Sequence, residues 1–155
     1  MVEIERKFLV TSQAFKKEAR GSNRILQGFL NRDPLRTVRV RVSGDKGFIT
    51  VKGKGNQSGT TRFEWEKEIP MHEAEALIPL CEPGVIDKKR YFVEVGKHVF
   101  EVDEFFGDNA GLIVAEIELS HEEEGYTRPE WLGEEVTNEI KYYNSQLSKR
   151  PFKSW

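Results

Sequence analysis

The chain opens with MVEIERKFLV (residues 1–10), and this stretch decides the fold because it alternates like a β-strand. Successive side chains of a strand point to opposite faces, so every second residue shares a face. One face carries Val2, Ile4, Phe8 and Val10, and the other carries Glu3, Glu5 and Lys7, with Arg6 as the only exception among the charged residues. We therefore predict a first strand that buries its apolar face and lines up two carboxylates and an ammonium on the other.

Similar segments, bounded by turn residues, recur along the chain. They predict strands at 1–10, 24–32, 36–43, 47–54, 61–69, 85–95, 98–106 and 112–120. Helices are predicted at 11–20, 72–80 and 137–149, the last with Ile140, Tyr143 and Leu147 on one face. About eight strands with mostly short connections favour antiparallel pairing and either a barrel or a sandwich.

The polar faces of these strands carry paired charges, often of one sign. The pairs and runs are Arg39 and Arg41; Lys52 and Lys54; Arg62, Glu64, Glu66 and Glu68; Lys88 and Arg90; Glu101 and Asp103; and Glu116 and Glu118. A sheet with one solvated face would explain charge as such. However, like charges two residues apart repel unless an opposite charge lies between them. A hard cation between the carboxylates, or a polyanion between the bases, would provide this opposite charge. A closed barrel whose charged face points inward would have room for the cation and the polyanion together.

Composition narrows the class of protein. The 155 residues fit one domain, 1–155, and a net charge of −2 from 26 acidic and 24 basic residues predicts no nucleic-acid partner. The single cysteine, Cys81, forms no intramolecular disulfide. No signal peptide and no apolar stretch of about 18 residues is visible, so we expect a cytoplasmic protein without a membrane partner. The composition leaves a homodimer open.

A set of segments resembles one known family, in the family's order. They are EIERK (3–7), LQGFL (26–30), VRVRV (38–42), TVKGK (50–54), RFEWE (62–66), KKRY (88–91), VDEF (102–105), AEIEL (115–119) and EEVTNEIKYYNSQLS (134–148). This chain resembles the CYTH, or triphosphate tunnel metalloenzyme, family over nearly its whole length, and is most similar to its short bacterial members, many of them inorganic triphosphatases. The resemblance implies an α+β fold: a closed eight-stranded antiparallel β-barrel, the triphosphate tunnel, with flanking helices.

The resemblance also implies roles for individual residues. Its metal-site carboxylates, for Mg²⁺ or Mn²⁺, correspond to Glu3, Glu5, Glu116 and Glu118, with Glu64, Glu66 and Asp103 as nearby candidates. Its triphosphate-binding bases correspond to Lys7, Arg39, Arg41, Lys52, Arg62, Lys88, Arg90 and Lys141, and its catalytic groups to Glu5, Lys7 and Lys88. Many short members have Tyr where this chain has Phe29.

The implied function is metal-dependent hydrolysis of a linear triphosphate, with inorganic tripolyphosphate cleaved to diphosphate and phosphate. Such an enzyme is an inorganic triphosphatase, a phosphoric anhydride hydrolase, whose partner is a small anionic triphosphate. The alternatives are a nucleoside or thiamine triphosphatase, a class IV adenylyl cyclase, a polyphosphate-binding module without catalysis, and a scaffold with an exposed sheet. Clustered acids favour catalysis, because a pure anion binder has no use for them. The sequence leaves open whether a second metal, a glutamate or a lysine positions the attacking water.

Overall fold

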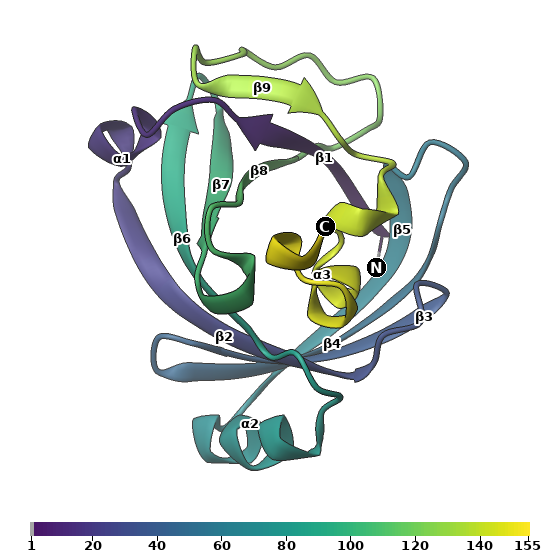
Figure 1. Ribbon diagram of the computed structural model, residues 1–155. Helices are drawn as coiled ribbons and strands as arrows, with labels where there is room; N and C mark the ends of the chain where they lie inside the picture. The colour runs from purple at the N-terminus through teal and green to yellow at the C-terminus, as the bar shows by residue number, and fades with distance from the viewer. Residues whose placement is uncertain (1) are drawn as a thin grey trace.

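The computed structural model, which describes residues 2–155, is a β-barrel whose helices lie outside the wall or across one opening (Figure 1). The strands are β1 (Val2–Val10), β2 (Gly21–Asn31), β3 (Arg36–Ser43), β4 (Lys46–Gly55), β5 (Thr61–Ile69), β6 (Ile86–Val95), β7 (His98–Phe105), β8 (Ile113–Glu118) and β9 (Leu132–Glu135). Their order is β5-β4-β3-β2-β6-β7-β8-β1-β9, and pairing of β1 with β5 closes the ring. The closed eight-stranded antiparallel barrel is therefore confirmed, and the short strand β9 is an addition that was not predicted.

Strand β1 is the element that closes the barrel. One of its edges pairs with β8, from Glu5 opposite Glu118 to Leu9 opposite Val114. Its other edge is divided, because its first residues pair with β5 and its last residues pair with β9. With both edges engaged, β1 forms part of the wall, and alternate residues of it face the lumen.

The apolar face of the strands packs outside the lumen, which forces the charged face inward. Phe8 and Phe100 are fully buried there, under Phe15 of α1 (Phe15–Glu18) and under Trp131. The aromatic rings meet edge to face, with the Phe100 and Trp131 centroids 5.6 Å apart. On the β3–β4 side, α2 (Met71–Leu77) covers the outer face of the wall.

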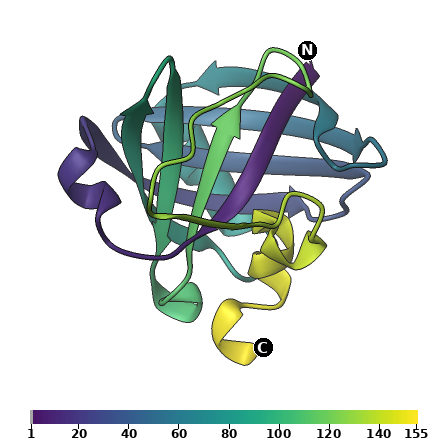
Figure 2. The same cartoon turned by 90° about the horizontal axis from the view of Figure 1, so that it is seen from above.

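A second apolar cluster fills one end of the lumen. It contains Phe29 of β2, Ile86 of β6, Phe105 of β7 and Leu147, all no more than 3% exposed. The C-terminal segment that carries Leu147 lies across this opening of the barrel (Figures 1 and 2). The charged part of the lumen therefore has an apolar boundary on one side.

The helices are shorter than predicted. The helix expected at 11–20 is reduced to α1, and that expected at 72–80 is α2 followed by a 3-10 turn at Ile78–Leu80. The single helix expected at 137–149 is wrong, because extended Tyr143 (φ −66°, ψ 136°) separates a 3-10 turn at Ile140–Tyr142 from α3 (Asn144–Lys149). Ile140 is consequently 53% exposed, away from the buried Leu147. Across residues 2–155, no helix is long and apolar enough to cross a membrane.

The C-terminal segment packs closely against Gly84, where no side chain stands in its way. A side chain at this position should therefore destabilise the protein strongly. Gly84 has φ +96°, and a Cβ there would lie 1.9 Å from the carbonyl oxygen of Ser148. We expect Gly84→Ala to lower the free energy of unfolding by at least about 2 kcal/mol, from backbone strain and displacement of α3 together. Gly44→Ala is the control, because Gly44 has φ +61° but no neighbouring atom within 4 Å, so it should cost about 1 kcal/mol. Equal losses in urea denaturation would contradict the docking argument.

Candidate active site

The charged part of the lumen encloses a cavity of about 270 Å³. Its cationic lining is Lys7, Arg39, Arg41, Lys52, Arg62, Lys88 and Arg90, and its anionic lining is Glu3, Glu5, Glu64, Glu66, Glu101, Glu116 and Glu118. Lys88 is fully buried, and Lys7 and Arg90 are 6% and 8% exposed. Most of the paired charges therefore face the lumen, where the two signs meet, whereas Lys54 and Glu68 are exposed and lie outside this lining.

Two of the residues proposed from the sequence lie outside this lining. Asp103 is buried behind it, with its carboxylate 2.8 Å from the Lys88 ammonium and 2.8 Å from Nε of Arg90. This carboxylate therefore holds two lining cations in place, and its role as a metal ligand stays a prediction. Lys141 is exposed on the 3-10 turn, and its ammonium lies 4.6 Å from the centre of the Trp155 ring.

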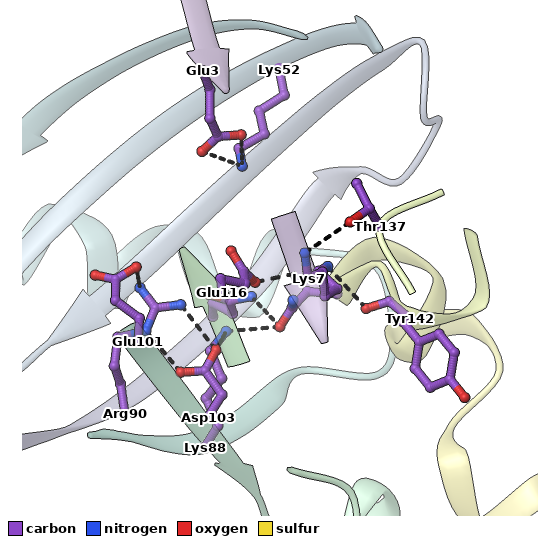
Figure 3. Close-up of polar contacts among 12 residues, drawn as sticks. Glu3, Lys7, Lys52, Lys88, Arg90, Glu101, Asp103, Glu116, Thr137 and Tyr142 are labelled. Carbon is purple, nitrogen blue, oxygen red and sulfur yellow. Dashed lines mark hydrogen bonds and ion pairs between the residues drawn. The ribbon is translucent and has the colours of Figure 1, made fainter. Parts of the chain in front are cut away.

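Two lysines connect the acidic and basic parts of the lining (Figure 3). Lys52 donates to Glu3 at 2.8 Å and lies 3.4 Å from Glu64. The Lys7 ammonium lies 3.8 Å from the Glu116 carboxylate and donates to the Tyr142 carbonyl at 3.3 Å. Strand β1 thus contributes to both parts, since Glu3, Glu5 and Lys7 project from the same face.

Burial and neighbouring charges shift the pKa values of the carboxylates of β1 and β8 in different directions. Burial raises the pKa of Glu5 well above its usual range, and the neighbouring Glu116 carboxylate raises it further. Burial likewise raises the pKa of Glu3, despite the opposing charge of Lys52, and of Glu118. Burial alone would also raise the pKa of Glu116, but Lys7 and a hydrogen bond shared with Glu5 hold it well below its usual range. A cation in this space would stabilise the ionised forms of all of them.

The carboxylates fit a divalent metal that is bound together with a substrate. Within residues 2–155, no group of three Asp, Glu, His or Cys side chains is arranged to hold an ion without other ligands. Mg²⁺ in phosphate-handling sites commonly takes only one or two carboxylates, and substrate phosphates and water complete its octahedron. Glu3, Glu5, Glu116 and Glu118 provide hard oxygen ligands of this kind beside the cations that would hold the phosphates.

The arginines on the basic side are arranged for an anion. Nε of Arg39 is buried and has no hydrogen-bond partner among the described residues, while its Nη2 donates to Thr50 at 3.1 Å. Burial lowers the pKa of Arg41 well below its usual range, and the charges of Arg39 and Arg90 lower it further. Neighbouring guanidinium groups that repel one another, one of them with an N–H that is unpaired within residues 2–155, favour a phosphate, which accepts hydrogen bonds from several of them.

Lys88 differs from the other cations in its surroundings. Its ammonium contacts Asp103 at 2.8 Å and Asn144 at 2.9 Å. Burial lowers the pKa of Lys88 to about 7, against the opposing effect of Asp103. Both the charged and the neutral amine are therefore accessible near neutral pH.

Several lining residues were not found from the sequence. Glu101 lies on the same strand face as Asp103, so strand alternation could have predicted Glu101 as a lining residue. The remaining polar lining residues are Thr37, Thr50, Thr137, Tyr143, Asn144 and Ser145. The Tyr143 ring lies 5.2 Å from the Lys7 ammonium and 5.5 Å from the Arg62 guanidinium, in the segment that was expected to be continuous helix.

Comparison with known proteins gives one consistent result. A model of the CYTH domain matches residues 1–151. An inorganic triphosphatase of Acetivibrio thermocellus is 46% identical over 99% of this chain and 97% of its own length. Another, from Nitrosomonas europaea, is 34% identical over 96% of this chain and 97% of its length. A solved structure of an inorganic triphosphatase, 32% identical, superposes with a TM-score of 0.64 over 94% of this chain and 93% of that one.

Proposed function

Because this chain belongs to the CYTH domain family, we propose that it is an inorganic triphosphatase that hydrolyses tripolyphosphate to diphosphate and phosphate with a divalent metal. The observation that carries the proposal is the enclosed cavity in which clustered bases face clustered carboxylates. Phosphoryl transfer depends almost entirely on positioning and on stabilisation of charge, and such a cavity is suited to both.

The bases hold the substrate. Arg39, Arg41, Lys52, Arg62, Arg90 and Lys7 surround the cavity from different strands, so one linear polyanion can contact several of them at once. Nε of Arg39 gains its missing partner when a phosphoryl oxygen enters. The resulting charge-assisted hydrogen bonds fix the position of the chain of phosphoryl groups along the lumen.

The carboxylates of Glu3, Glu5, Glu116 and Glu118 hold the metal, with Glu64 and Glu66 beside them. Bound there, Mg²⁺ or Mn²⁺ offsets the negative charge of phosphoryl oxygens in the transition state. Glu5 is central to this role, since both burial and the Glu116 carboxylate favour its protonation until a cation compensates. The protein therefore binds the metal most strongly at a pH at which Glu5 has lost its proton.

Lys88 accepts the proton of the attacking water. The water oxygen forms a bond to the terminal phosphorus while the bridging oxygen leaves with diphosphate, and the water proton passes to Nζ of Lys88. A pKa of about 7 is suited to a general base at neutral pH. In the neutral amine, two N–H groups serve Asp103 and Asn144, which leaves the lone pair for the water.

One experiment distinguishes tripolyphosphate from the other candidate substrates. We would measure phosphate release from tripolyphosphate, diphosphate, ATP and thiamine triphosphate, each with Mg²⁺, with Mn²⁺ and with chelator. The proposal expects metal-dependent turnover of tripolyphosphate far above the others, and poor turnover of diphosphate, which is one phosphoryl group short. Tight binding of tripolyphosphate without turnover would instead indicate a polyphosphate-binding module.

Removal of a single arginine should weaken substrate use strongly. We expect Arg39→Ala to lower kcat/KM for tripolyphosphate roughly 10- to 150-fold, because charge-assisted hydrogen bonds contribute about 1.5–3 kcal/mol. Arg24→Ala is the matched control, since Arg24 forms its ion pair with Asp87 at 2.6 Å on the exposed side of the wall. If both variants retain wild-type kcat/KM, Arg39 does not contact the substrate.

A further inference from the structure

One side-chain amide connects two of the cations that line the cavity. Oδ1 of Asn144, the first residue of α3, accepts a hydrogen bond from Nζ of Lys88 at 2.9 Å. The same oxygen accepts a second hydrogen bond from Nε2 of Gln27 at 3.1 Å. Because the lysine ammonium only donates, the oxygen of the Asn144 amide must be the atom that faces it.

The connection continues to a cation on another strand. Gln27 is fully buried, and its Oε1 accepts a hydrogen bond from Nε of Arg41 at 2.9 Å. An unbroken series of hydrogen bonds therefore joins Lys88 of β6 to Arg41 of β3 through Asn144 and Gln27. Buried polar series of this kind are rigid only when every member is satisfied.

This series determines the direction of the Lys88 side chain. Two of the three positions on Nζ are taken by Asp103 and Asn144, and because Lys88 lines the cavity, the third position is the one available to a bound group. Asp103, which already binds Arg90, attracts the ammonium. Among the described residues, the Asn144 oxygen is the only other hydrogen-bond acceptor of this ammonium, and the centre of the Phe105 ring lies 5.5 Å from Nζ. The amide oxygen thus acts against that attraction and keeps the third position of Nζ directed into the cavity.

Contacts other than the Asn144 side chain also anchor α3. Gln146 donates to the carbonyl of Arg32 at 3.1 Å, Ser148 donates to the carbonyl of Pro83 at 3.1 Å, and Leu147 is fully buried. These contacts anchor the helix on the outer end of the barrel. The Asn144 amide is therefore not the only anchor of the helix, and its oxygen is directed to Lys88 and Gln27.

We propose that Asn144 is a positioning residue that, with Gln27, holds Lys88 and Arg41 in a fixed relative arrangement, so that both contact one bound triphosphate at the same time. This inference rests on the proposed triphosphatase function and assigns a role to the C-terminal segment within it. If one oxygen positions both cations, removing that oxygen already removes part of the contribution of Arg41. The loss of kcat/KM in the double variant should then be smaller than the product of the two single losses.

A double-mutant cycle tests this overlap. The kcat/KM for tripolyphosphate is measured for wild type, Arg41→Ala, Asn144→Ala and the double variant at saturating Mg²⁺, with thermal unfolding as a check of folding. We expect about a 10-fold loss from Asn144→Ala and a loss in the double variant at least about 5-fold smaller than the product of the single losses. The control cycle uses Lys149→Ala, an exposed residue of the same helix, which should leave activity near wild type and the effect of Arg41→Ala undiminished.

A second variant keeps the test decisive if Asn144→Ala does not fold. Asn144→Asp retains an oxygen for both donors, so the fold-loss from Arg41→Ala should be the same as in the wild-type background. Multiplicative losses in the Asn144→Ala cycle, or an altered Arg41→Ala effect in the Asn144→Asp background, would overturn the positioning role. These results leave the proposed function intact, whereas a wild-type protein that does not hydrolyse tripolyphosphate refutes the function itself.

Discussion

Glu5→Gln is expected to lower tripolyphosphate hydrolysis by a factor on the order of 10²–10³, as when one group that stabilises transition-state charge is removed. The substitution preserves volume and removes one anionic ligand from the carboxylates of β1 and β8. Steady-state phosphate release at saturating Mg²⁺ measures the effect. Turnover within a few-fold of wild type would remove Glu5 from the metal site.

The same substitution should stabilise the protein in the presence of chelator. The pKa of Glu5 is raised in the folded state, so the group favours folding below its unfolded pKa, and this contribution is lost as pH rises through the folded pKa. At neutral pH without metal the ionised Glu5 therefore costs stability, and Gln has no such cost. We expect a higher melting temperature for Glu5→Gln than for wild type at pH 7 in chelator, with a difference that shrinks at pH 4. The control Glu94→Gln changes an exposed carboxylate and should alter stability by no more than about 0.5 kcal/mol.

Strand alternation predicted the strands and their charged faces but left a barrel or a sandwich open, and the resemblance to the CYTH family decided for the closed barrel. Alternate residues that start at Glu3 in β1, at Arg39 in β3 and at Lys88 in β6 are charged. When β1 closes the barrel, these charged faces point into the lumen. The same alternation could not predict where the charged part of the lumen ends. Phe29, Phe105 and Val114 have the parity of the charged residues, yet they form the apolar end of the lumen. Position along the barrel axis depends on stagger between strands, which a single sequence does not reveal.

The C-terminal segment was the least predictable part of the site. Its apolar spacing indicated one continuous helix, but the chain turns at Tyr143, where contacts with the barrel outweigh local helix propensity. That turn places the Tyr143 ring beside Lys7 and Arg62 and brings Asn144 to Lys88. A hydrogen bond between residues 56 positions apart follows from docking of the C-terminal segment across the barrel opening and has no local signal.

Lys88→Met should be the most damaging single change on the basic side, with kcat/KM reduced about 10²- to 10⁴-fold, the range expected for loss of a general base. Burial lowers the pKa of Lys88 to about 7, so the free enzyme gains the neutral amine as pH rises through that value. A base must be neutral to accept a proton, so the ratio of wild-type to variant kcat/KM should rise between pH 6 and pH 8 and then level off. Taking this ratio at each pH cancels the titration of tripolyphosphate itself. Lys89→Met is the matched control, because the neighbouring lysine lies on the opposite face, over the Tyr91 ring at 5.3 Å. A ratio that falls over the same pH range would mean that Lys88 acts only as a charged substrate ligand, and a ratio near one would exclude it from the reaction.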